Sequence, residues 1–115
     1  MRVLIVDDHP SFRASARKLL EAEGYEVVGE AADGGEALRA AEELHPDLVL
    51  LDIALPDVDG FVVAEQLAAL DGRPDVVLTS SRDSADYGKC IADSSARGFV
   101  PKAELSGAVL TTLLA

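Results

Sequence analysis

Polar side chains that suit phosphate chemistry stand at the ends of four short apolar segments of the chain. They are a pair of neighbouring carboxylates, a third carboxylate, a hydroxyl group and a lysine: Asp7, Asp8, Asp52, Thr79 and Lys102. Three carboxylates at one place repel one another, and they form the oxygen-rich site that Mg²⁺ or Mn²⁺ prefers. A lysine and a metal ion would supply the compensating positive charge. Because a carboxylate can form an aspartyl phosphate, this set favours phosphoryl transfer onto an aspartate.

The apolar pattern around these residues predicts the elements that position them. Short continuous apolar runs predict buried strands, and apolar residues three or four apart predict helices between them. The predicted strands are Val3–Val6, Glu26–Ala31, Asp47–Asp52, Val76–Thr79 and Gly98–Val100. The predicted helices are Pro10–Glu23, Gly34–Leu44, Phe61–Leu70, Asp83–Ser95 and Leu105–Leu114. The fourth helix carries the weakest apolar stripe, so we expect it to pack least firmly.

The alternation of strands and helices predicts one α/β domain over residues 1–115. Right-handed crossovers make the strands parallel and place helices on both faces of the sheet. Parallel strands end at the same edge, and ligands bind outside their carboxyl ends. We therefore expect the three carboxylates, Thr79 and Lys102 to meet at one edge of the sheet.

Composition and charge narrow the class of protein. Hydrophobic residues make up 49% of the 115 residues, which predicts a folded domain rather than a disordered segment. The 10 basic and 21 acidic residues give a net charge of −11, which disfavours contact of this domain with nucleic acid or an anionic membrane. No apolar run approaches the roughly 18 residues that span a bilayer. We expect a cytoplasmic domain in which Cys90, the single cysteine, is a small core residue and His9 is a loop residue.

In their order along the chain, the polar residues resemble the receiver domain of two-component response regulators. The resemblance runs from the opening Val-Leu-Ile-Val-Asp-Asp-His-Pro to the last predicted helix. The loop Leu55–Gly60 and the segment Gly98–Lys102 match the corresponding parts of that family, and His9–Pro10 and Pro101–Leu105 resemble its NarL/FixJ-like (LuxR-type) subgroup. The resemblance implies a flavodoxin-like (CheY-like) fold, a doubly wound (βα)5 three-layer sandwich with a parallel sheet in strand order 2-1-3-4-5.

The resemblance also implies roles for the acidic residues. Asp52 would be the phosphoacceptor, which takes a phosphoryl group from a phosphohistidine of a sensor histidine kinase. Asp8 and Asp52 would bind Mg²⁺ (or Mn²⁺) directly, and Asp7 would act through a water molecule. The main-chain carbonyl of Ala54 would be a further metal ligand, so the alanine side chain does not matter there.

Further roles follow for residues at the ends of the fourth and fifth strands. Lys102 would pair with the phosphoryl oxygens, and Thr79 would hydrogen-bond one of them. Phe99 would be the switch aromatic, which turns inward when Thr79 moves. Ser80, where many receivers have alanine, would modulate the access of water to the acyl phosphate. The domain would catalyse its own phosphorylation and slow dephosphorylation, as a switch and not as a turnover enzyme.

Several questions of context stay open in the sequence. Whether the chain forms a homodimer on phosphorylation is left open by the sequence. The resemblance implies control of transcription through a C-terminal helix-turn-helix domain that binds DNA and is absent from these 115 residues. The chain would then be a fragment, whereas the alternatives are a stand-alone receiver and a constitutive interaction module. A Mg²⁺-dependent phosphohydrolase of the haloacid-dehalogenase type is disfavoured, because it needs an acid where this chain has Ala54. A flavodoxin-like cofactor binder is disfavoured because Asp7 and Asp8 would repel the cofactor phosphate.

Overall fold

A computed structural model describes residues 1–81 and 87–114 of the chain. Its strands are β1 (Arg2–Val6), β2 (Glu26–Ala31), β3 (Leu48–Asp52), β4 (Asp75–Ser80) and β5 (Gly98–Pro101). Its helices are α1 (Pro10–Ala22), α2 (Gly34–Leu44), α3 (Gly60–Ala68), α4 (Gly88–Asp93) and α5 (Gly107–Leu114), and a 3-10 helix covers Lys102–Glu104. The strands form one parallel sheet in the order β2-β1-β3-β4-β5. The predicted fold class and strand order are confirmed.

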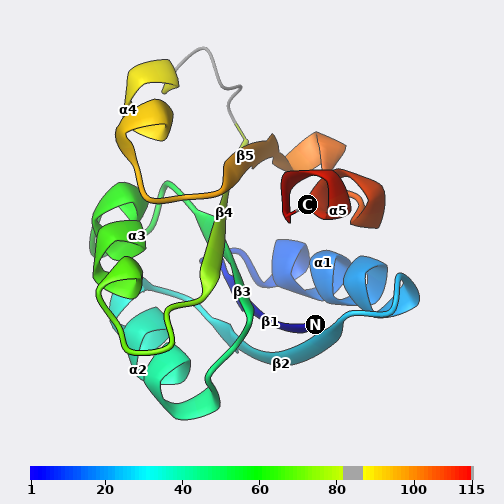
Figure 1. The fold of residues 1–115 in the computed structure, drawn as a ribbon. Coiled ribbons are helices and arrows are strands. Elements are labelled where there is room, and N and C mark those ends of the chain that lie inside the picture. Colours follow the sequence, from blue (N-terminus) through cyan, green and yellow to red (C-terminus); the bar gives the residue numbers. More distant parts are fainter. Residues whose placement is uncertain (82–86, 115) are drawn as a thin grey trace.

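Helices cover both faces of this sheet. α1 and α5 lie on one face, and α2, α3 and α4 lie on the other (Figure 1). In β1, Val3 and Ile5 pack with α1 and α5, whereas Leu4 and Val6 pack with α2 and α3. Successive residues of a strand face opposite sides, so a strand covered on both sides must be apolar throughout. This explains why the continuous apolar runs of β1 and β3 form the centre of the sheet.

The ends of the first two helices follow from capping residues in the sequence. α1 begins with Pro10, whose fixed φ suits a first helical position, and Gly24 follows its end with φ +93°. α2 begins after Asp33, whose side chain accepts a hydrogen bond from the Glu36 N–H at 2.8 Å. His45 ends α2 in the left-handed conformation, with φ +49°. No helix in the described part of the chain is long and apolar enough to cross a membrane.

The fourth helix differs most from its prediction. The predicted start at Asp83 lies outside the described residues, and α4 covers Gly88–Asp93. None of the residues of α4 is buried, in agreement with its weak apolar stripe. The prediction that Cys90 is a core residue is wrong, because this side chain is exposed. The short helix stands off the core, and the ring of Tyr87 before it makes the contact with α3 instead.

Gly60 allows α3 to begin directly against the strand that carries Asp52. Its N–H donates a hydrogen bond to the Ile53 carbonyl at 2.8 Å. A Cβ atom at this position would lie 2.5 Å from the Asp52 carbonyl oxygen and 2.6 Å from the Ile53 Cα. Both neighbours are backbone atoms of a buried strand end, so neither can move aside cheaply.

We expect Gly60→Ala to lower the free energy of unfolding by about 1–3 kcal/mol, because the added methyl group overpacks the strand end. Chemical denaturation measures this loss. Gly88→Ala is the matched control, since a Cβ atom there meets nothing within 4 Å. A Gly60→Ala chain as stable as the Gly88→Ala chain would contradict the proposed need for glycine.

Candidate functional site

The carboxyl ends of β1, β3, β4 and β5 bring the predicted polar residues to one edge of the sheet. Asp7 and Asp8 follow β1 directly, and Asp52 is the last residue of β3. Asp52 pairs in register with Thr79 of β4. β4 pairs in turn with β5, which ends just before Lys102. Residues as far apart in the sequence as Asp7 and Lys102 therefore lie together, as parallel strands require.

The ammonium group of Lys102 joins two buried carboxylates at this edge. Its Nζ lies 2.6 Å from Asp7 Oδ2 and 3.2 Å from Asp52 Oδ2. The side chains of Asp7 and Asp52 are 0% and 3% exposed, and that of Lys102 is 15% exposed. Ion pairs this deeply buried are weakly screened by solvent, so the loss of one partner has a large effect. Asp8 adds a third carboxylate whose side chain is 34% exposed.

The pKa shifts of Asp52 and Lys102 reflect this crowding. Burial raises the pKa of Asp52, and the neighbouring Asp7 raises it further, against the opposing effects of Lys102 and of the Ala54 N–H. Burial alone would lower the pKa of Lys102, but its contacts with Asp7 and Asp52 outweigh burial, and the net pKa is raised. Lys102 therefore stays charged, and the site keeps more acidic groups than basic ones.

The donor atoms of this site fit a divalent cation. One ligand atom from each of Asp7, Asp8, His9 and Asp52 lies within 4.8 Å of the others. Among the described residues, the buried Oδ1 atom of Asp8 has no hydrogen-bond partner. Carboxylate oxygens that converge in this way are the ligands that Mg²⁺ prefers. The backbone of Ala54 lies beside them, because its N–H donates to Asp52 Oδ1 at 3.2 Å.

The predicted switch residues lie next to the acidic site. Thr79 is 1% exposed, and its hydroxyl has no hydrogen-bond partner in the described part of the chain. Ser80 follows it and is also buried. Phe99 of β5 lies 6.4 Å from the ring of Tyr87, which lies 6.0 Å from the ring of Phe61. A row of aromatic rings thus connects β5 with the starts of α4 and α3.

Three residues of the first helix region also reach the site, although we did not predict a role for them. The ring of Phe12 lies 4.7 Å below the Lys102 ammonium. Arg13 donates a hydrogen bond to the Asp7 carbonyl at 2.6 Å and is itself held by Glu30. His9 is a loop residue as predicted, but its ring contacts the acidic pair. Their only sequence signal is closeness to Asp7, which does not reveal side-chain direction.

Asp57 ties the loop after β3 to the start of α2. Its carboxylate accepts hydrogen bonds from the N–H groups of Gly34 at 2.9 Å and Gly35 at 3.1 Å. The hydrogen bond from Gly34 is the main reason that the pKa of Asp57 is lowered. A helix N-terminus favours a negative charge in this position. The contact restrains the loop that follows Asp52.

We expect the stabilising effect of Asp57 to depend on pH. Because its folded-state pKa is lowered from the ordinary value of 3.8, the carboxylate stabilises the fold above that value and loses the effect as the pH falls through the folded pKa. The free energy of unfolding of the wild type should exceed that of Asp57→Asn at neutral pH, and the gap should close in acid. Asp71→Asn, at an exposed position, serves as the control. A gap that is independent of pH would contradict the assignment.

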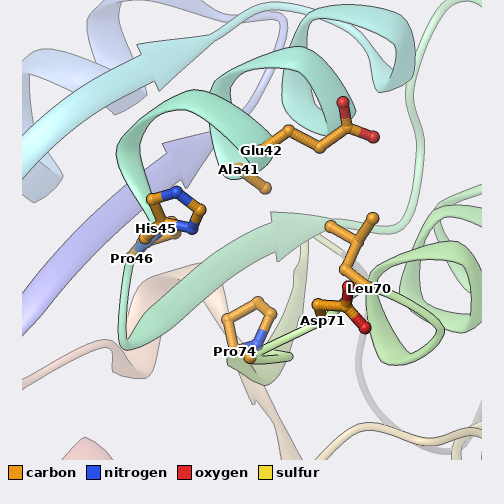
Figure 2. Close-up of a pocket in the computed structure, with 8 residues that line it drawn as sticks. Ala41, Glu42, His45, Pro46, Leu70, Asp71 and Pro74 are labelled. Atoms are coloured by element: carbon orange, nitrogen blue, oxygen red, sulfur yellow. The ribbon is translucent and has the colours of Figure 1, made fainter.

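A cavity lies at the opposite end of the sheet from the predicted site residues. It has a volume of about 230 Å³ and is lined by the end of α2 and the turn after α3 (Figure 2). Its polar groups come from Glu42, His45 and Asp71. None of the predicted site residues lines it, so the candidate site is the open acidic edge and not this cavity.

Comparisons with known proteins agree with the fold. A profile of the response regulator receiver domain matches residues 3–114. The chain is 38% identical over 104 residues to the DNA-binding transcriptional activator EvgA of Escherichia coli (strain K12), covering 90% of this chain and 51% of EvgA. The chain thus spans about half the length of the curated relatives that it matches.

Solved structures show the same architecture. A two-component response regulator of the LuxR family from Aurantimonas sp. SI85-9A1 superimposes with a TM-score of 0.86 and 34% identity, over 98% of this chain and 84% of that chain. The signal receiver domain of NarL from Mycobacterium tuberculosis gives a TM-score of 0.84 and 35% identity, over 99% of this chain and 96% of that chain.

Proposed function

The chain belongs to the response regulator receiver domain family, in its NarL/FixJ-like subgroup, and on this basis we propose that Asp52 accepts a phosphoryl group from a phosphohistidine of a sensor histidine kinase. The observation that carries the proposal is the position of Asp52. It is a buried carboxylate at the end of the central strand, paired with Lys102 and facing a further acidic pair. A carboxylate that only stabilised the fold would gain nothing from such repulsive neighbours.

In the proposed reaction, one carboxylate oxygen of Asp52 attacks phosphorus while the bond from phosphorus to the histidine nitrogen breaks. The imidazole leaves with the bonding electrons. Lys102 already lies 3.2 Å from Asp52, so its positive charge meets the phosphoryl oxygens without a large rearrangement. In the later dephosphorylation, water attacks phosphorus, the bond from phosphorus to the Asp52 oxygen breaks, and inorganic phosphate leaves. The domain returns to its starting state, so it acts as a switch with slow self-hydrolysis rather than as a turnover enzyme.

The proposed cofactor is Mg²⁺ (or Mn²⁺). Asp7, Asp8 and Asp52 would hold it, together with the main-chain carbonyl of Ala54. When bound, the ion supplies positive charge that offsets the charge of the carboxylates and of the phosphoryl oxygens. The chain itself contributes the arrangement of the ligands. The ammonium group of Lys102 contacts both Asp7 and Asp52 and so reduces the repulsion between their carboxylates, and Asp8 is partly exposed to solvent.

The proposed switch runs from Thr79 to α4. The Thr79 hydroxyl is buried and has no hydrogen-bond partner among the described residues, so a phosphoryl oxygen on Asp52 would offer it one. Its movement would free space for Phe99, whose ring packs on Tyr87 at the start of α4. Because α4 buries none of its described residues, a small free-energy change is enough to shift its position.

The proposed output is control of transcription through a DNA-binding domain outside these 115 residues, with homodimerisation on phosphorylation and action in the cytoplasm. EvgA, about twice as long, is named as a DNA-binding transcriptional activator. The net charge of −11 disfavours direct contact between this domain and DNA. A stand-alone receiver, whose partner is another protein, is the alternative output.

The test of the proposed function uses acetyl phosphate as the donor. With Mg²⁺ present, the intact mass should rise by one phosphoryl group, and a chelator should abolish the rise. Beryllofluoride, a mimic of the phosphoryl group, should change amide exchange in α4. A folded chain that takes up no phosphoryl group from either acetyl phosphate or a histidine kinase would contradict the proposal. Unchanged amide exchange would leave phosphorylation standing but contradict the Thr79–Phe99 coupling.

A further inference from the structure

The imidazole of His9 lies over the acidic pair. Its Nδ1 atom is 3.0 Å from Asp7 Oδ1 and 3.1 Å from Asp8 Oδ1. The chain contains only two histidines. The other, His45, lines the cavity at the opposite end of the sheet (Figure 2). His9 is therefore the one imidazole placed to act on the site.

Helix capping does not explain this placement. His9 is the N-cap residue of α1, a position that favours a short side chain that hydrogen-bonds the first helical N–H groups. The His9 side chain makes no such bond. Its ring is turned toward the carboxylates, and the backbone N–H of His9 also donates to Asp7 Oδ1 at 2.8 Å.

The donors converge as the ligands of a metal ion do. Nδ1 of His9 shares a hydrogen bond with Asp7 Oδ1, but Asp8 Oδ1 is buried and forms no hydrogen bond to any described residue. That oxygen lies 3.1 Å from Nδ1 of His9, but the two atoms do not form a hydrogen bond. Asp52 completes a set of three oxygens and one nitrogen within 4.8 Å. The two buried members, Asp7 and Asp52, are held in place by Lys102.

Such a mixed set treats different divalent ions differently. Mg²⁺ is a hard ion that prefers oxygen ligands and keeps several waters. Imidazole nitrogen is a good ligand for transition-type ions such as Zn²⁺. In closed structural sites Zn²⁺ binds four protein ligands in a tetrahedral arrangement. The His9 side chain is 64% exposed, so it can swing into solvent when only oxygen ligands are needed.

Building on the metal site of the proposed function, we propose that His9 makes this site selective between divalent ions. A transition ion such as Zn²⁺ recruits the His9 imidazole beside Asp7, Asp8 and Asp52, whereas Mg²⁺ binds with His9 displaced. With four protein ligands the zinc form has no open position for a phosphoryl oxygen, whereas a Mg²⁺ ion that keeps several waters can exchange one of them for that oxygen. Zinc therefore competes with phosphorylation.

The test measures the binding of Zn²⁺ and of Mg²⁺ separately by calorimetry in the wild type and in two variants. His9→Ser keeps a good N-cap residue and removes the imidazole, and His45→Asn removes the other imidazole at a position where asparagine tolerates the left-handed backbone. We expect His9→Ser to weaken Zn²⁺ binding by about tenfold or more, and to change Mg²⁺ binding by less than about twofold. His45→Asn should change neither. The nitrogen resonances of the His9 ring should shift with Zn²⁺ but not with Mg²⁺.

Unchanged Zn²⁺ binding in His9→Ser, or an equal loss of both ions, would overturn the proposal, because the second result would indicate a purely structural role. A loss of Zn²⁺ binding in His45→Asn alone would place the zinc elsewhere and would also overturn it. Failure of the proposed function looks different: the wild type would bind Zn²⁺ through His9 but take up no phosphoryl group.

Discussion

An Asp52→Asn chain is expected to take up no phosphoryl group from acetyl phosphate or a histidine kinase, under conditions that label the wild type. The amide has nearly the same shape as the carboxylate but lacks a nucleophilic, negatively charged oxygen. Intact mass measures the loss, which should be complete. Asp7→Asn is the matched variant: it removes a neighbouring acid but keeps Asp52, so labelling should be slower and not absent. Labelling of Asp52→Asn would place the phosphoacceptor elsewhere.

The same substitution is expected to make the fold more stable at neutral pH without metal. Burial, followed by the charge of Asp7, raises the folded pKa of Asp52, so its ionised form is disfavoured in the native state. The stabilising contribution of a group with a raised folded pKa is present at low pH and is lost as the pH rises through that pKa. The Asn variant should therefore be more stable than the wild type at neutral pH, and the difference should shrink in acid. A less stable variant at neutral pH would contradict this account of the site.

Lys102→Met is expected to lower the free energy of unfolding by about 3–5 kcal/mol in the absence of divalent metal. Methionine keeps much of the stem of lysine but removes the ammonium that lies 2.6 Å from Asp7 and 3.2 Å from Asp52. Two carboxylates with almost no exposure would then face each other without a counter-ion. Chemical denaturation in the presence of a chelator measures the loss, and Mg²⁺ should restore part of it.

Two further variants separate the lost charge from the lost packing. Lys102→Met combined with Asp7→Asn should recover much of the stability, because the carboxylate of Asp52 then no longer faces the charged carboxylate of Asp7. Lys89→Met, at an exposed position of α4, should change the free energy of unfolding by less than about 0.5 kcal/mol. If the double variant were no more stable than Lys102→Met alone, the loss would come from packing against Phe12 and not from charge.

The sequence by itself determined the order of the elements and the edge at which the site forms. Periodicity is a local property: β1 and β3 carry the continuous apolar runs Val3–Val6 and Leu48–Leu51 because helices cover both their faces, and that pattern is visible without coordinates. Once the strands are parallel, their carboxyl ends must share an edge. Asp52 and Lys102, fifty positions apart, could therefore be predicted to meet, and their Oδ2 and Nζ atoms lie 3.2 Å apart.

Only the tertiary structure decided which further side chains reach that edge. The ring of His9 lies on the acidic pair, Arg13 binds the Asp7 carbonyl, and Asp57 binds the start of α2. Cys90 is exposed although its helix pattern predicted a core position. These outcomes depend on rotamers and on how far each helix stands from the sheet, which are set by packing between segments distant in sequence. A pattern of residue types predicts which face of a helix or strand is buried. The direction of a side chain at the end of that element is decided by its neighbours in space.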